Sequence, residues 1–209
     1  LLLQASSCGF PSLPLGPRLL AGWDREPHSP NQLTEVFVTE QDHRMAAFVA
    51  SARFTTTLNL NFGDSLWVTN TGTIFTESGN AVSGAGADVI LVAGFVMSNA
   101  ATGISLGAGS NVISVSETGF VYGQTTAIVA NGGNNVFTNV GGIIGRTSDA
   151  VAFQNGSNTF SNGGVIIGAA HALSIAGTGG NTITNYGSLQ GGTGDGISIT
   201  SDNNSINNS

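Results

Sequence analysis

A repeat of 23 residues is the feature of this sequence that most restricts its fold. Consecutive stretches that begin at Asn135, Asn158 and Asn181 are three versions of the pattern N-x-[IF]-[TS]-N-x-G-x-[IL]-x-G. A fixed period of this size is typical of a repeat architecture, in which each copy forms one unit that must stack on its neighbours to bury a core. The sequence therefore predicts an elongated stack of coils.

The same period continues on both sides of these three copies. Earlier units begin at Ser65, Asp88 and Asn111, and a truncated unit begins at Asn204. In this register, the third position of every unit is large and apolar: Trp67, Ile90, Ile113, Phe137, Phe160, Ile183 and Ile206. This column is predicted to form one wall of a continuous core.

Each unit holds about three short strand-like pieces, which are plainest in the copy from Asn181, as NTITN, GSLQG and DGISIT. The second piece carries an apolar residue at position nine (Val96, Ile143, Ile166, Leu189), and the third carries apolar pairs two residues apart (Ile104 with Leu106, Val151 with Phe153, Leu173 with Ile175, Ile197 with Ile199). Residues two apart in a strand point the same way. The expected fold is all-β: a right-handed parallel β-helix of about six full coils, with three short strands per coil of about 23 residues. The hand follows the general preference of parallel crossovers.

Two polar features fit such a stack. Asparagines that recur in register can hydrogen-bond along it as ladders; they are Asn111, Asn135, Asn158, Asn181 and Asn204, with Asn139, Asn162, Asn185 and Asn208 four residues later. Glycines follow the first strand, where a sharp turn and a positive φ are expected to favour them; they are Gly94, Gly142, Gly164 and Gly187.

The chain divides into three parts. Residues 1–44 hold all five prolines and show no repeat, which predicts a disordered leader or an extension that does not belong to the natural protein. A signal peptide or a lipoprotein signal at Cys8 is an alternative, although the basic start and long apolar centre of a signal peptide are missing. Residues 45–64 are predicted to cap the stack, and residues 65–209 to form the β-helix repeats, continuous with further repeats.

Composition excludes several classes of function. The chain has only five Lys plus Arg against twelve Asp plus Glu, so it lacks the basic surface that nucleic-acid binding requires. No apolar run approaches the roughly 18 residues that a transmembrane helix needs. A single cysteine allows no internal disulfide. A polar, weakly acidic surface rich in Gly, Asn, Ser and Thr suits a secreted or cell-surface protein.

The repeat pattern quoted above resembles the coils of bacterial parallel β-helix surface proteins, in particular autotransporter passenger domains and haemagglutinin-like adhesins. The resemblance covers residues 65–209 and implies a secreted, elongated stalk whose partner is a host surface or a glycan. Similar coils occur in secreted proteins with haemolysin-type calcium repeats. The stretch Gly191–Ile199, GGTGDGISI, approaches their motif, but Asp195 comes one residue early and no second copy follows. Calcium is therefore expected, if at all, only in a longer protein.

No catalytic, cofactor-binding or metal-binding residue is predicted. Asp149 and Asp195 share position fifteen but are separated by a unit that has Ala172 there, which would place the carboxylates about 10 Å apart. His171 has no acidic neighbour in sequence and is expected to be a solvent-exposed turn residue. A row of hydroxyls that could bind ice or sugars is the remaining candidate: Ser114, Thr138, Ser161 and Thr184.

The expected function is that of a non-enzymatic structural stalk or adhesive surface within a larger secreted or cell-surface bacterial protein. Two alternatives stay open from sequence. The chain could belong to a calcium-dependent type I secreted repeat protein, or to a β-helix carbohydrate-active enzyme whose catalytic coils lie elsewhere.

Overall fold

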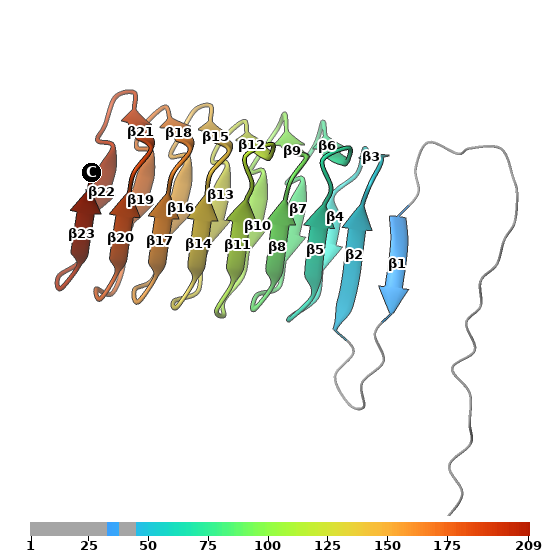
Figure 1. The fold of residues 1–209 in the computed structure, drawn as a ribbon, viewed down its shortest axis with the longest axis horizontal. Coiled ribbons are helices and arrows are strands. Elements are labelled where there is room, and N and C mark those ends of the chain that lie inside the picture. The colour runs from blue at the N-terminus through green and yellow to red at the C-terminus, as the bar shows by residue number, and fades with distance from the viewer. Residues whose placement is uncertain (1–32, 38–44) are drawn as a thin grey trace, which may run out of the picture.

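The computed structural model describes residues 45–209 and the backbone of residues 33–37. Every element in this described part is a β-strand, so no helix there could cross a membrane. The strands form three sheets that run side by side along one axis, as a parallel β-solenoid of seven coils (Figure 1). The three-sided parallel β-helix predicted from the repeat is confirmed.

Sheet A has nine strands: β1 (Leu33–Phe37), β2 (Ala46–Ala50), β5 (Ser65–Val68), β8 (Val89–Val92), β11 (Val112–Val115), β14 (Val136–Asn139), β17 (Thr159–Asn162), β20 (Thr182–Asn185) and β23 (Ser205–Asn208). Sheet B has seven: β3 (Arg53–Phe54), β6 (Thr73–Thr76), β9 (Phe95–Ser98), β12 (Phe120–Gly123), β15 (Gly142–Gly145), β18 (Val165–Gly168) and β21 (Ser188–Gly191). Sheet C also has seven: β4 (Leu58–Leu60), β7 (Val82–Gly84), β10 (Ile104–Leu106), β13 (Ile128–Ala130), β16 (Val151–Phe153), β19 (Leu173–Ile175) and β22 (Ile197–Ile199).

Each coil gives one strand to sheet A, then one to sheet B, then one to sheet C. Residues 46–60, expected as a cap, form a coil of their own from β2, β3 and β4, which pair in parallel with the next coil. The stack therefore has seven coils where six were expected. β1 lies antiparallel to β2 at the same end, and the rest of the predicted leader lies outside the described residues.

The core is a column of apolar side chains inside the three sheets. The predicted inward positions of sheets B and C are confirmed, because Val96, Ile143 and Ile166 are fully buried, as are the pairs of β10, β16 and β19. In the last coil Leu189, Ile197 and Ile199 are half-buried and pack against this core. The largest side chains meet in the middle: the Phe137 and Phe160 rings stack with centroids 4.9 Å apart, and the Phe153 ring lies edge-on to both. Burial of this column is the main source of stability.

One member of the predicted core column is wrong. Leu66, and not Trp67, pairs with Ile90, and Leu66 is buried while Trp67 is 51% exposed on the outer side of sheet A. The coil before Asp88 is one residue longer than the repeat, and a shift of one residue turns a strand side chain to the opposite face. Ile206 does continue the column beyond Ile183, but it is 53% exposed because no described strand packs beyond β23.

The two predicted asparagine ladders are confirmed. In the first ladder each Nδ2 donates to Oδ1 of the asparagine in the next coil over 2.7–2.9 Å, and it runs through Asn111, Asn135, Asn158, Asn181 and Asn204. In the second ladder the same bond is 2.7–2.8 Å and runs through Asn139, Asn162, Asn185 and Asn208. The rungs between these ends are buried. The ladders therefore satisfy polar groups that the core excludes from water.

The glycines after the first strand serve close packing and not a positive φ. None of the four predicted positions has φ above zero. A Cβ on Gly94, Gly164 or Gly187 would lie 2.2 Å from a carbonyl oxygen of the preceding coil. Only a residue without a side chain lets the coils stack at this corner, while Gly142 lies within β15.

Candidate functional surfaces

The structure brings together three polar residues that the sequence register keeps apart. Val151, Leu173 and Ile197 pair in adjacent strands of sheet C, and Asp149, His171 and Asp195 each lie two residues before them. The three therefore occupy successive coils of one column at the corner between sheets B and C. The two aspartates lie two coils apart, as expected, but the residue between them is His171 and not Ala172. The coil that begins at Asn158 reaches sheet C one residue early, and Ala172 is buried.

Hydrogen bonds join this column through the backbone. Oδ1 of Asp149 accepts the His171 N–H at 3.0 Å, and Nδ1 of His171 accepts the Asp195 N–H at 2.8 Å. An imidazole nitrogen that accepts is unprotonated, so the ring proton is assigned to Nε2. The same type of bond occurs in an earlier coil, where Asn80 Oδ1 accepts the Thr102 N–H at 3.2 Å. The column thus resembles a structural ladder on the outside of the solenoid, and His171 is half-buried within it.

No group of three or more His, Cys, Asp or Glu side chains within the described residues is arranged to hold a metal ion. In the Asp149–His171–Asp195 column, the hydrogen bonds described above go to backbone N–H groups of the next coil. The chemistry that this column supports is therefore hydrogen bonding between coils.

A second acidic pair, which the sequence reasoning missed, is fully buried. Asp64 and Asp88 occupy the first ladder's column in the coils before Asn111, and both have no exposed surface. Oδ1 of Asp88 has no hydrogen-bond partner, and burial, followed by the charge of Asp64, raises the pKa of Asp88. The signal was present in the sequence, since the unit at Asp88 opens with Asp where later units open with Asn.

The predicted hydroxyl row lies on the outer side of sheet A. Ser114, Thr138, Ser161 and Thr184 pair in adjacent strands, one per coil. In the coils before Ser114 the same column holds Leu91 and Trp67. The row is therefore continuous over four coils and becomes apolar toward the N-terminal end; its binding to ice or sugars stays a prediction.

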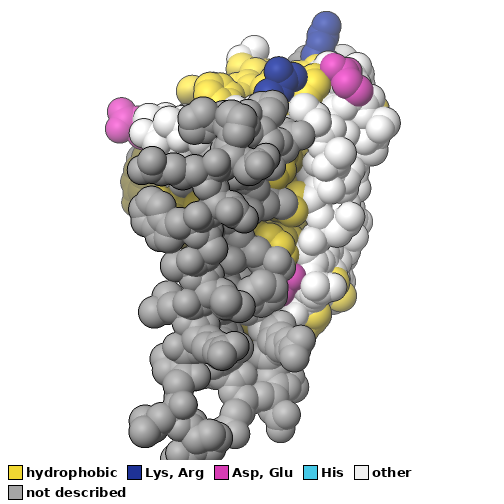
Figure 2. All heavy atoms as spheres, turned by 90° about the vertical axis from the view of Figure 1, so that its right-hand side faces the viewer, with side chains coloured by type: hydrophobic (Ala, Val, Ile, Leu, Met, Phe, Trp, Pro, Cys, Tyr) yellow, Lys and Arg dark blue, Asp and Glu magenta, His cyan; other side chains and the backbone are white. Residues whose placement is uncertain are grey.

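The outer side of sheet B is apolar. We use the name apolar band for its large apolar outward-pointing side chains in coils two to six, which are Phe75, Phe95, Met97, Phe120, Tyr122, Ile144, Val165 and Ile167. The Phe95 and Phe120 rings lie 6.2 Å apart, and the Arg53 guanidinium lies 5.2 Å from the Phe75 ring centroid. Figure 2 shows hydrophobic side chains along this edge of the molecule, with basic side chains beside them.

No family model matches the chain, and no curated protein or solved structure is significantly similar to it.

Proposed function

We propose that residues 45–209 serve as a rigid, non-enzymatic stalk with adhesive outer faces, within a larger secreted or cell-surface bacterial protein. The observation that carries this proposal is the uninterrupted stack: each of the seven coils pairs in parallel with its neighbours in all three sheets. At about 4.8 Å per coil, the described stack extends for roughly 30 Å. Flat faces of this kind present repeated side chains at a constant spacing.

Several features support a stalk or binding surface over an enzyme. Within the described residues, the only stacked acid–histidine–acid column uses the Asp149 carboxylate and His171 Nδ1 to accept backbone N–H groups of the next coil. Glycosidases need two carboxyl groups about 5–10 Å apart on either side of a bound sugar, whereas the hollow that Asp195 lines at the open end of coil seven does not include Asp149. A sparse charge, with five Lys plus Arg and twelve Asp plus Glu, suits contact with polar, uncharged partners such as glycans.

The test compares binding with turnover. The full chain is immobilised and exposed to an array of glycans and to a panel of soluble polysaccharides, while release of reducing ends is measured. We expect retention of one or more glycans without release of reducing ends, and no change in the double variant Asp149→Asn, Asp195→Asn. The matched control is Asp202→Asn, a change at an exposed corner.

Two results would overturn the proposal. Release of reducing ends that is lost in the double variant but kept in the control would establish a carbohydrate-active enzyme. Absence of binding to every glycan and to host-cell surfaces would remove the adhesive function. A requirement for Ca²⁺ in binding would instead favour the calcium-dependent class of secreted repeat proteins.

A further inference from the structure

The apolar band is not the usual outer surface of this solenoid. In sheet C the corresponding outward positions are mostly small and polar: Asn59, Ser83, Ser105, Val129, Ala152, Ser174 and Ser198. In sheet B each of five successive coils has at least one large apolar side chain at these positions, and only Thr73 and Gly142 interrupt the series, although the inner positions of the same strands already supply the core. Phe95 and Val165 are 44% and 46% exposed. A contiguous apolar surface of this kind marks an interaction site.

A polar row borders the apolar band where the chain leaves sheet B. The row has one residue per coil, because Asn99 N–H bonds Thr76 O, Gln124 N–H bonds Ser98 O and Arg146 N–H bonds Gly123 O. From coil two to coil five it therefore consists of Glu77, Asn99, Gln124 and Arg146. Opposite charges stand at its two ends, with two amides between them.

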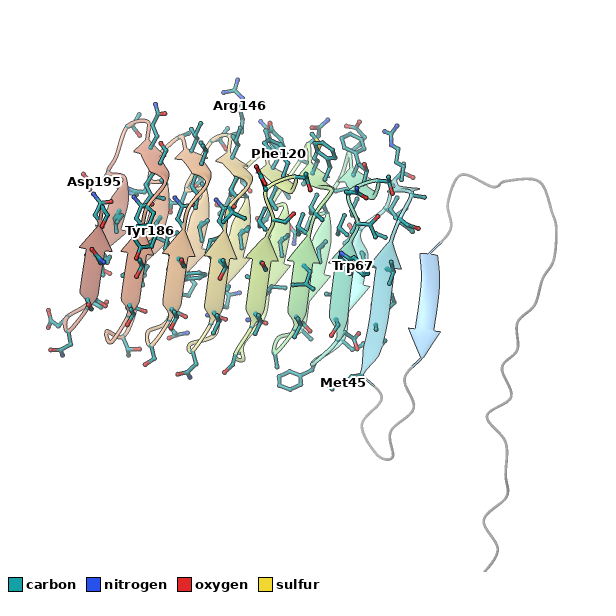
Figure 3. The ribbon with its side chains drawn as sticks, viewed as in Figure 1. Met45, Trp67, Phe120, Arg146, Tyr186 and Asp195 are labelled. Atoms are coloured by element: carbon teal, nitrogen blue, oxygen red, sulfur yellow. The ribbon has the colours of Figure 1, made fainter. Side chains whose placement is uncertain are left out.

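Both charged ends of the row are available to a partner. Glu77 and Arg146 are exposed, and Glu77 accepts one hydrogen bond, from Asn99 Nδ2 at 3.2 Å. The Arg146 side chain forms no hydrogen bond or ion pair within the described residues, and it points away from the solenoid (Figure 3). An arginine that extends from the rim of an apolar face can bind a carboxylate on another molecule.

The order of this row is complementary to itself. A two-fold axis that runs along the strand direction, midway between coils three and four, exchanges coil two with coil five and coil three with coil four. It places Glu77 opposite Arg146 of the second copy and Asn99 opposite Gln124. Within the band the same operation places Phe95 opposite Phe120, Met97 opposite Tyr122 and Phe75 opposite Ile144.

From this match we propose that the apolar band and its polar row form an interface between two antiparallel copies of this chain. Self-complementary contact through one patch is what a two-fold dimer requires. A shift by one coil would place Arg146 opposite Asn99 and Glu77 opposite Ala169, so the charges select one register. Sheets that pack face to face cross at up to about 30°, and such an angle keeps the central coils in contact.

The area of the apolar band indicates how tightly the two copies should bind. Strands of four residues are about 13 Å long, and the five coils of the band span about 24 Å, which gives a flat area of about 310 Å² on each copy. This is less than half of the roughly 800 Å² that each partner contributes to a standard specific interface. The dimer is accordingly expected to be weak, so that it forms only at high protein concentration.

Sedimentation equilibrium of the full chain over about 1–500 μM tests the interface. The wild-type mass rises from monomer to dimer with concentration. Arg146→Glu and Glu77→Arg each weaken the dimer at least about tenfold, because each change sets like charges against each other at both symmetry-related contacts. The double variant Arg146→Glu, Glu77→Arg restores the wild-type constant, since the pairs are exchanged. Ile144→Thr also weakens the dimer, and the control Asp202→Arg leaves it unchanged.

Two results overturn the interface. The first is a monomer at every concentration. The second is a dimer that neither single charge reversal weakens, which would locate self-association elsewhere, for example at the exposed end of β23. Far-ultraviolet circular dichroism checks that each variant is folded. If a charge reversal does not fold, Arg146→Gln and Glu77→Gln take its place; each must weaken the dimer, and no effect from either rejects the interface.

Discussion

The residue type at the position where each coil enters sheet A differs between the two halves of the solenoid. From coil four onward it holds asparagine, whose Nδ2 donates to the next rung and whose Oδ1 accepts from the rung before, as in the 2.9 Å bond from Asn111 to Asn135. In coils two and three it holds Asp64 and Asp88, and ionised aspartate only accepts. The Asp64 oxygens accept the N–H groups of Asn61 and of Ala46, which lies in the preceding coil. One amide in place of one carboxyl therefore decides whether the side chain also donates to the rung in the next coil.

The two halves also differ in the free-energy cost of burying their polar side chains. An amide rung is neutral and is satisfied along the stack, whereas Asp88 is buried with one oxygen unpartnered. Removing a polar group from water without a partner is costly, and more so for a charge. The aspartate half is therefore expected to be the weaker part of the ladder, and the asparagine half the stronger.

The largest expected effect comes from breaking the asparagine half through its core. Phe160→Asp places an unpaired charge among Phe137 and Phe153, where the native ring is fully buried. We expect a loss of about 5 kcal/mol or more in the free energy of unfolding, because a cavity and a buried charge add. Chemical denaturation followed by circular dichroism measures it.

The neighbouring residue is the control for Phe160→Asp. Ser161 lies in the same strand and points outward, so Ser161→Asp should change the free energy of unfolding by no more than about 1 kcal/mol. Similar denaturation midpoints for the two variants would contradict the inward register of β17.

A smaller effect is expected from converting the aspartate half to the asparagine type. Asp88→Asn removes the desolvated carboxyl and adds an Nδ2 that can donate to Asn111 Oδ1, which now receives the Asp88 N–H at 3.1 Å. The variant should be more stable at pH 7 by about 1 kcal/mol. Urea denaturation of both proteins between pH 3 and pH 8 measures this gain.

The pH dependence has a definite sign. Burial, and then the charge of Asp64, raises the pKa of Asp88 above its ordinary value of 3.8. The pKa of Asp88 is about 3.8 in the unfolded chain and higher in the folded protein. Between these two values the folded protein binds more protons than the unfolded chain, so the stability contributed by this group falls as pH rises from about 3.8 through the raised pKa. The Asp88→Asn variant should lack this decrease, whereas the exposed control Asp202→Asn should keep it. An unchanged pH profile in Asp88→Asn would refute the assignment.

Asn158→Asp is the converse substitution. It transfers an aspartate rung into the asparagine half, where it removes the 2.9 Å bond from Nδ2 to Asn181 Oδ1. The variant should be less stable than the wild type at pH 7, and its free energy of unfolding should decrease as the pH rises, which the wild-type asparagine at this position does not cause. Asn131→Asp, at an exposed position, is its control.

The period of the sequence was sufficient to predict the fold, because stacked coils repeat the same inward positions and the same ladder. The errors in the register predicted from this period came from turns whose length varies by one residue. The coil before Asp88 is longer, which misplaced Trp67, and the coil from Asn158 reaches sheet C early, which hid the alignment of His171 with Asp149 and Asp195. Insertions at corners leave strand spacing intact, so apolar periodicity alone cannot locate them.

The apolar band was missed for a different reason. Its side chains alternate with core residues, as in Phe95, Val96 and Met97, so the strand reads as continuously apolar. A run of this kind does not distinguish its inner from its outer face. Only the paired strands show that Val96 is the inward residue and that Phe95 and Met97 are outward.

The smallest expected effect tests the corrected register in the aspartate half. Trp67→Thr replaces an outward, half-exposed ring with the residue type that occupies the same column at Thr138 and Thr184. The change in the free energy of unfolding should stay within about 0.5 kcal/mol, as for surface substitutions in general. Leu66→Thr, one residue away, should cost about 3 kcal/mol, because it leaves a hydroxyl and a cavity against Ile90 in the core. Urea denaturation of both variants measures the difference, and a larger loss for Trp67→Thr than for Leu66→Thr would restore the original 23-residue register in this coil.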